Sequence, residues 1–69
     1  MTENLLNSIK ENTENLLSKK YSNKDLVNTL YSRSLAFLKQ PTLQTTVDIC
    51  SLVLTIYISN SKPNYLKSP

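Results

Sequence analysis

The chain has 69 residues and a mass of 7.9 kDa, which suits one small domain and excludes a large enzyme core. Domains of this size usually need disulfides, a metal or a partner for stability. The chain contains one cysteine and no histidine, so a partner is the expected source of stability. Its net charge of +3 comes from eight basic residues spread along the chain, which is typical of a solvated surface.

The sequence predicts one all-α domain over residues 1–69. Glycine is absent, so tight hairpins and phosphate-binding loops lack their usual residue. We expect a small bundle of three short helices over residues 3–19, 23–40 and 43–59. An irregular, flexible tail should follow over residues 60–69, because Pro63 and Pro69 cannot continue a regular helix far.

The first expected helix is weak. Its apolar residues Leu5, Ile9 and Leu16 fall at helical spacing. Asparagines such as Asn7 and Asn12 compete for backbone hydrogen bonds inside a helix. We therefore expect residues 1–20 to form a helix that depends on packing or on a partner.

The second expected helix has clear limits at both ends. Ser22 followed by Asp25 resembles a capping box and predicts a start near residue 23. Pro41 should end the helix near Gln40. The apolar positions between these limits follow the helical period, and they include Leu30, Tyr31, Phe37 and Leu38.

The third segment, residues 42–59, is open to two interpretations. Its β-branched residues favour a strand by composition. Its polar residues recur every three or four positions and would form one stripe on a helix, namely Gln44, Asp48, Ser51, Thr55, Ser59 and Lys62. We favour the helix, with Thr42 or Thr45 near its start. Its main apolar line is Leu43, Val47, Cys50, Leu54 and Tyr57.

Two short helices cannot cover so wide an apolar surface on a third, so we expect a partner interface there. On this hypothesis Leu54→Asp abolishes partner binding. A replacement on the polar stripe, such as Thr55→Glu, leaves binding intact.

The sequence offers little for catalysis. Cys50 has no histidine base and lies in an apolar line, so we interpret it as a small hydrophobic residue. The five carboxylates are scattered. We expect no enzyme activity, no cofactor and no metal site. No secretion signal or membrane span is visible, so we expect a soluble intracellular protein.

Part of the chain resembles a known family. The pairs Leu30-Tyr31 and Phe37-Leu38, followed by residues 43–50, resemble the Mozart family, the mitotic-spindle organizing microproteins of the γ-tubulin complex. The match covers roughly residues 27–50. It implies a helical core made of Leu30, Tyr31, Phe37, Leu38, Leu43, Val47, Ile49 and Cys50, and periodicity extends the partner surface to Leu54 and Tyr57.

The resemblance implies a noncatalytic adaptor that binds the helical N-terminal regions of γ-tubulin complex proteins. Such an adaptor supports microtubule nucleation or recruitment in the cytoplasm and cytoskeleton, at a microtubule-organising centre or spindle pole. One alternative is a small nucleic-acid-binding protein that uses the basic loop 19–24. Another is a virus- or plasmid-encoded inhibitor of a host complex. The free chain could also form a homo-oligomer.

Overall fold

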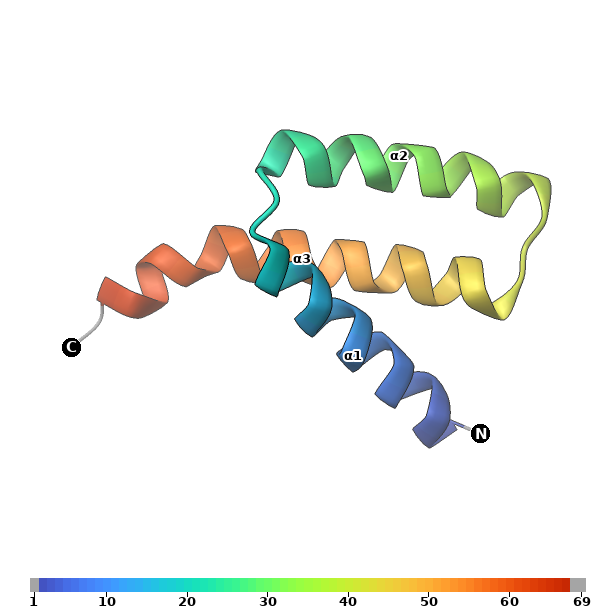
Figure 1. Cartoon of the computed structure of the whole chain (residues 1–69), viewed down its shortest axis with the longest axis horizontal. Helices are drawn as coiled ribbons and strands as arrows, with labels where there is room; N and C mark the ends of the chain where they lie inside the picture. The colour runs from blue at the N-terminus through green and yellow to red at the C-terminus, as the bar shows by residue number, and fades with distance from the viewer. Residues whose placement is uncertain (1, 68–69) are drawn as a thin grey trace.

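Three helices account for nearly all of the chain. The computed structural model describes the backbone of residues 2–67 and the side chains of residues 3–61. Helix α1 spans Thr2–Lys19, α2 spans Asn23–Lys39 and α3 spans Leu43–Lys67 (Figure 1). The predicted all-α fold of three packed helices is confirmed, and residues 43–59 are helical rather than extended.

Local side-chain chemistry sets where α2 and α3 begin. The Ser22 hydroxyl accepts a hydrogen bond from the Asp25 amide at 3.1 Å, as the capping pattern predicts. The Thr42 hydroxyl accepts from the Thr45 amide at 3.1 Å, and the Thr42 amide donates to the Thr45 hydroxyl at 2.9 Å. Helices α2 and α3 therefore both start with a side chain that accepts a hydrogen bond from an otherwise unpaired backbone amide.

In the link from α1 to α2, one residue has the left-handed backbone conformation that glycine usually adopts. Lys20 has a φ of 56°, and its amide donates to the Leu17 carbonyl at 3.2 Å. A left-handed residue after a helix is a common C-terminal stop, and a side chain there costs about 1–2 kcal/mol relative to a right-handed backbone. Because the chain has no glycine, it carries this strain at a lysine.

The prediction for the C-terminal part of the chain was wrong over most of its length. Helix α3 continues past residue 59 to Lys67, so residues 60–67 are helical instead of irregular (Figure 1). Pro63 removes one amide donor from the helix, which is a local penalty that does not by itself end the helix. The last two residues of the expected tail, 68 and 69, lie outside the described residues.

The helices form a flat layer with α3 in the middle. Both α1 and α2 pack on α3, and over the described residues they do not pack closely on each other. In Figure 1, α2 runs antiparallel beside α3, whereas α1 crosses α3 at an angle. The molecule measures 43 × 28 × 16 Å. Its radius of gyration is 12.9 Å, against about 11 Å for a compact domain of this length.

A flat layer leaves a small core. Among the described side chains, the buried hydrophobic residues are Leu26, Val47 and Leu52. Three buried hydroxyl residues, Thr13, Ser51 and Thr55, lie beside them. The interior thus contains as many buried hydroxyl residues as buried hydrophobic ones, and most large apolar side chains lie elsewhere.

Candidate functional site

The middle of the polar stripe of α3 faces the neighbouring helices. Ser51 and Thr55 are fully buried, and Asp48 is half-buried. The Ser51 hydroxyl donates to the Val47 carbonyl at 2.7 Å and lies 3.3 Å from the Ile9 carbonyl of α1. Thr55 is 1% exposed, so Thr55→Glu places a charge in the interior and is unsuitable as the surface control that the polar stripe suggested.

Burial of these hydroxyls is possible because each finds an acceptor on its own helix. The Thr55 hydroxyl donates to the Ser51 carbonyl at 2.7 Å, and the Thr13 hydroxyl donates to the Ile9 carbonyl at 2.7 Å. A hydroxyl bound to the carbonyl four residues earlier avoids the cost of an unsatisfied buried polar group. Such short side chains also let α1 approach α3 closely.

Most of the expected apolar line of α3 lies on the opposite side of the helix, whereas its member Val47 is buried. The exposed large apolar residues there are Leu43, Leu54 and Tyr57 of that line together with Val53, with exposed fractions between 42% and 74%. Cys50 is half-buried and falls on the same line by the helical period. The third helix therefore directs its hydroxyl residues inward and a row of apolar side chains outward.

A second apolar row follows α2. Val27, Tyr31, Leu35 and Leu38 have exposed fractions between 45% and 76%. Their spacing of four, four and three residues places them along one side of the helix. Leu26 immediately precedes this row in sequence but is 2% exposed, because it points toward the interior.

The row on α3 points away from α2. Leu52 is 3% exposed and lines a groove with Leu26 and Thr29 of α2. Leu54 follows Leu52 by two positions, which is about half a turn of helix, so it lies on the opposite side of α3. Leu43, at the start of the α3 row, lines a groove with residues of α1.

We define the apolar face as the exposed apolar residues of α2 and α3 together with Cys50: Val27, Tyr31, Leu35, Leu38, Leu43, Cys50, Val53, Leu54 and Tyr57. The structure brings six of the nine predicted partner-binding residues to this face. They are Tyr31, Leu38, Leu43, Cys50, Leu54 and Tyr57.

The other three predicted residues belong to the interior side of their helices. Val47 is buried, and Leu30 and Phe37 are half-buried. Sequence reasoning missed Val27, Leu35 and Val53 as members of the apolar face. The steps of four residues from Val27 to Tyr31 and on to Leu35 were the available signal for two of them.

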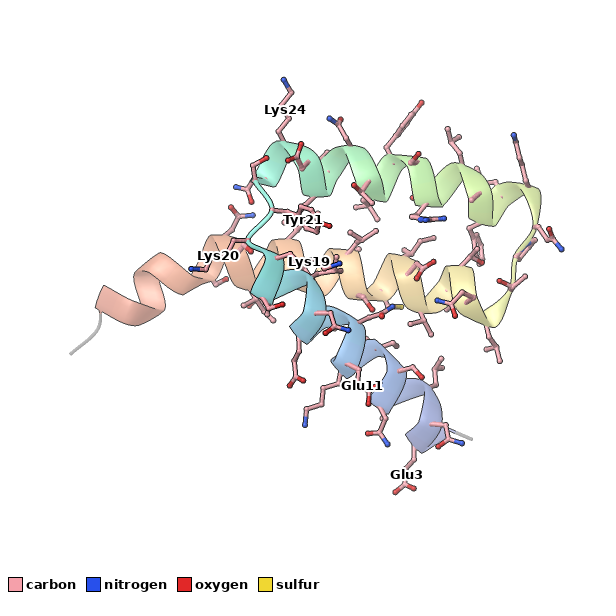
Figure 2. All side chains as sticks on the ribbon, in the orientation of Figure 1. Glu3, Glu11, Lys19, Lys20, Tyr21 and Lys24 are labelled. Atoms are coloured by element: carbon pink, nitrogen blue, oxygen red, sulfur yellow. The ribbon has the colours of Figure 1, made fainter. Side chains whose placement is uncertain are left out.

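The basic loop does not form one patch. Lys19, Lys20 and Lys24 are all exposed, and Figure 2 shows their side chains pointing in different directions. Tyr21 lines the groove with Leu16 on one side of the loop. A nucleic-acid surface gathers its cations on one face, and this arrangement does not. The nucleic-acid alternative stays a prediction without geometric support.

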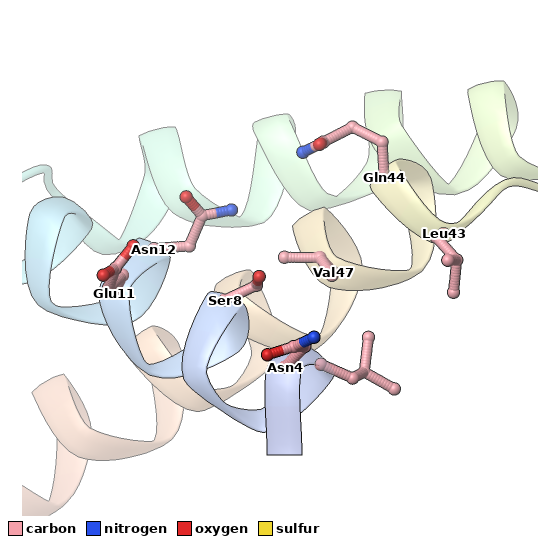
Figure 3. A pocket seen from close by; sticks show the side chains of 8 residues that line it. Asn4, Ser8, Glu11, Asn12, Leu43, Gln44 and Val47 are labelled. Carbon is pink, nitrogen blue, oxygen red and sulfur yellow. The ribbon is translucent and has the colours of Figure 1, made fainter. Parts of the chain in front are cut away.

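A polar groove lies between α1 and the start of α3. It encloses about 560 Å³ and is lined by Asn4, Ser8, Glu11, Asn12 and Gln44 together with Leu5, Leu43 and Val47 (Figure 3). Among the described residues that line it, Glu11 is the only carboxylate. No group of three or more metal-ligating side chains occurs within the described part of the chain. The groove therefore gathers no recognisable catalytic set.

Over residues 2–67, no helix combines the length and hydrophobicity that crossing a bilayer requires. Comparison with protein-family models, with curated proteins and with solved structures finds no match for the chain. The resemblance to the Mozart family therefore rests on the residues quoted for it.

Proposed function

We propose that the chain is a noncatalytic helical adaptor whose apolar face binds a helical segment of another protein. One observation supports the proposal most directly. Among the described side chains, eight large hydrophobic residues of α2 and α3 are exposed, whereas three hydrophobic residues are buried between the helices. Monomeric proteins rarely expose contiguous apolar patches above a few hundred Å², and larger patches mark interaction sites.

The shape of the apolar face supports a helical partner. Each of the two rows of exposed apolar side chains, one on α2 and one on α3, runs along the axis of its helix. An amphipathic helix recognises such a surface through residues spaced by three and four positions. Tyr31 and Tyr57, each 68% exposed, are suitable anchors because their rings bury large areas while the hydroxyls stay near water.

For the identity of the partner we propose the N-terminal regions of γ-tubulin complex proteins. This assignment rests on the Mozart-like residues between about 27 and 50, of which Tyr31, Leu38, Leu43 and Cys50 lie on the apolar face. In that role the chain would support microtubule nucleation or recruitment at a microtubule-organising centre or spindle pole.

The test compares two aspartate variants for binding to a purified N-terminal region of a γ-tubulin complex protein, measured by fluorescence anisotropy. Leu54→Asp places a charge on the apolar face. The matched control, Leu6→Asp, places the same charge on α1 at a leucine that is 59% exposed. We expect wild type and Leu6→Asp to bind, and Leu54→Asp to bind at least about tenfold more weakly.

Absence of binding by the wild-type chain would exclude the γ-tubulin assignment and leave the adaptor function to a second experiment. In that experiment the same three proteins are used for affinity capture from the cells that express the chain. A protein captured by wild type and Leu6→Asp but lost with Leu54→Asp supports the adaptor. Equal capture by all three contradicts binding through the apolar face.

A further inference from the structure

We propose that two copies of the chain exchange their first helices, so that α1 of each copy docks on α3 of the other. The surface involved is the side of α3 that carries Ser51 and Thr55, so the exchange does not depend on the apolar face. Three features of the molecule support it: the attachment of α1, the strain in its link to α2, and the direction that α1 takes once the strain is released.

Helix α1 is attached to a single neighbour by few hydrogen bonds. It packs on α3 and not closely on α2. Among the described residues, Asn12 donates to the Asp48 carboxylate at 3.5 Å, and the Ser51 hydroxyl lies 3.3 Å from the Ile9 carbonyl. Both distances exceed the usual range for hydrogen bonds of their kind. Hydrogen bonding between α1 and α3 is therefore weak.

The three buried hydroxyls keep their short hydrogen bonds when α1 leaves. Thr13, Ser51 and Thr55 each donate at 2.7 Å to a carbonyl of their own helix. Apart from the exposed Leu6, the leucine and isoleucine side chains described in α1 are half-buried. Undocking of α1 thus exposes a limited apolar area and leaves no strong polar contact broken. Such an element opens locally at a lower free energy than the rest of a domain.

The link between α1 and α2 is strained while α1 is docked on its own α3. Lys20 has a φ of 56°, a conformation in which the Cβ of any residue other than glycine is crowded by the backbone. Residues 20–22 contain neither glycine nor proline, so they are free to become helical. Release of α1 relieves the strain by joining α1 and α2 into one helix. Short strained links favour the exchange of elements between copies.

Once joined to α2, α1 no longer reaches its own site on α3. The Asn23 side chain, at the start of α2, donates to the Asn60 side chain at 2.9 Å, and α2 runs antiparallel to α3 from there (Figure 1). A straight extension of α2 toward the N-terminus carries Ile9 about 21 Å beyond this point, in the direction opposite to Ser51. The α3 of a second copy in the same state provides the contacts that α1 has lost. In a two-fold symmetric pair, each copy gives one α1 and receives one.

The experiment is sedimentation equilibrium of the full chain from low micromolar to several hundred micromolar concentration, after incubation until the mass is constant. We expect a shift from the monomer mass of 7.9 kDa to twice that mass. Lys20→Gly should raise the dimer dissociation constant by about 100-fold or more, because glycine removes the strain of the monomer and weakens a continuous helix. Lys20→Ala, the matched control, removes the same charge but keeps a Cβ, and should dimerise at least as strongly as the wild type.

A wild-type chain that stays monomeric over the whole range would overturn the proposal. Equal dissociation constants for Lys20→Gly and Lys20→Ala would also overturn it, because the strain at Lys20 would then play no part. Leu54→Asp distinguishes the exchange from pairing through the apolar face. This variant should dimerise as the wild type does, and loss of its dimer would assign the pairing to the apolar face instead.

Hydrogen exchange of the dilute monomer gives a readout that needs no substitution. The amides of α1 should exchange through opening of α1 alone, at least about tenfold faster than the most protected amides of α2 and α3. If the slowest amides of all three helices were equally protected, α1 would leave α3 only when the whole chain unfolds. That result would refute the proposal.

Discussion

The burial of Thr55 in α3 predicts very unequal effects on stability for the same substitution at two adjacent residues. Thr55 is 1% exposed, and its hydroxyl binds a carbonyl of its own helix, so a carboxylate in its place finds no partner. An uncompensated buried charge costs about 3–5 kcal/mol, which is comparable with the whole stability of a domain this small. Thr55→Glu should therefore unfold the chain at neutral pH.

Leu54→Glu provides the contrast. Leu54 is 42% exposed on the apolar face, so its replacement should change the free energy of unfolding of the monomer by no more than about 0.5 kcal/mol. The assay is urea unfolding followed by circular dichroism at low micromolar concentration. Similar unfolding midpoints for the two variants would refute the inward orientation of the polar stripe.

The pH dependence of Thr55→Glu checks the cause of the destabilisation. Burial raises the pKa of a carboxyl, so the loss in free energy of unfolding is complete above the folded-state pKa of the introduced group. This loss should decrease as the pH falls. Below the unfolded-state pKa of about 4.3 the part of the loss that comes from the buried charge should be absent. A deficit that is the same at both pH extremes would indicate a steric cause instead.

Two further predictions concern the stability of the single chain. Leu26→Ala should lower the free energy of unfolding by about 2–5 kcal/mol, because Leu26 is one of few buried hydrophobic residues, whereas Leu6→Ala should have little effect in the same urea titration. Lys20→Gly should raise the thermal midpoint, with a net gain of about 0.5–1 kcal/mol, since glycine relieves the left-handed strain but adds freedom to the unfolded chain. An unchanged or lower midpoint would contradict that reading of Lys20.

Much of the helical architecture follows from local sequence. Ser22 and Thr42 mark helix starts because their hydroxyls reach backbone amides, and Pro41 marks a stop because it restricts the residue before it. The spacing of the polar residues from 44 to 59 correctly favoured a helix over the strand that composition suggested. These are short-range effects, and each involves residues close together in the chain.

The orientation of α3 could not be predicted in the same way. Hydrophobic patterning alone would turn the line through Leu54 inward, yet α1 packs on the side that carries Ser51 and Thr55. Serine and threonine can occupy that side because their hydroxyls donate to carbonyls of their own helix, which lowers the free-energy cost of burying them. Which side of α3 is covered depends on long-range packing.

The end of α3 was missed for a different reason. Pro63 was expected to end the helix soon after residue 59. The loss of one backbone hydrogen bond near a helix terminus does not end α3, which extends to Lys67. For the site, the prediction of an unpartnered apolar surface on residues 43–57 identified its α3 half. It missed Val27 and Leu35 on α2, because the apolar period of α2 does not show which of its apolar residues α3 leaves exposed.

The central claim is that the apolar face is the surface through which the chain binds, whatever occupies it. Hydroxyl-radical footprinting of the wild-type chain tests this directly, by comparing the dilute free chain with its partner-bound form. The account predicts that Tyr31, Leu54 and Tyr57 react in the free chain and are protected in the complex, while Leu6 reacts equally in both. Protection of Leu6 with unchanged reactivity of Tyr31 and Tyr57 would contradict it.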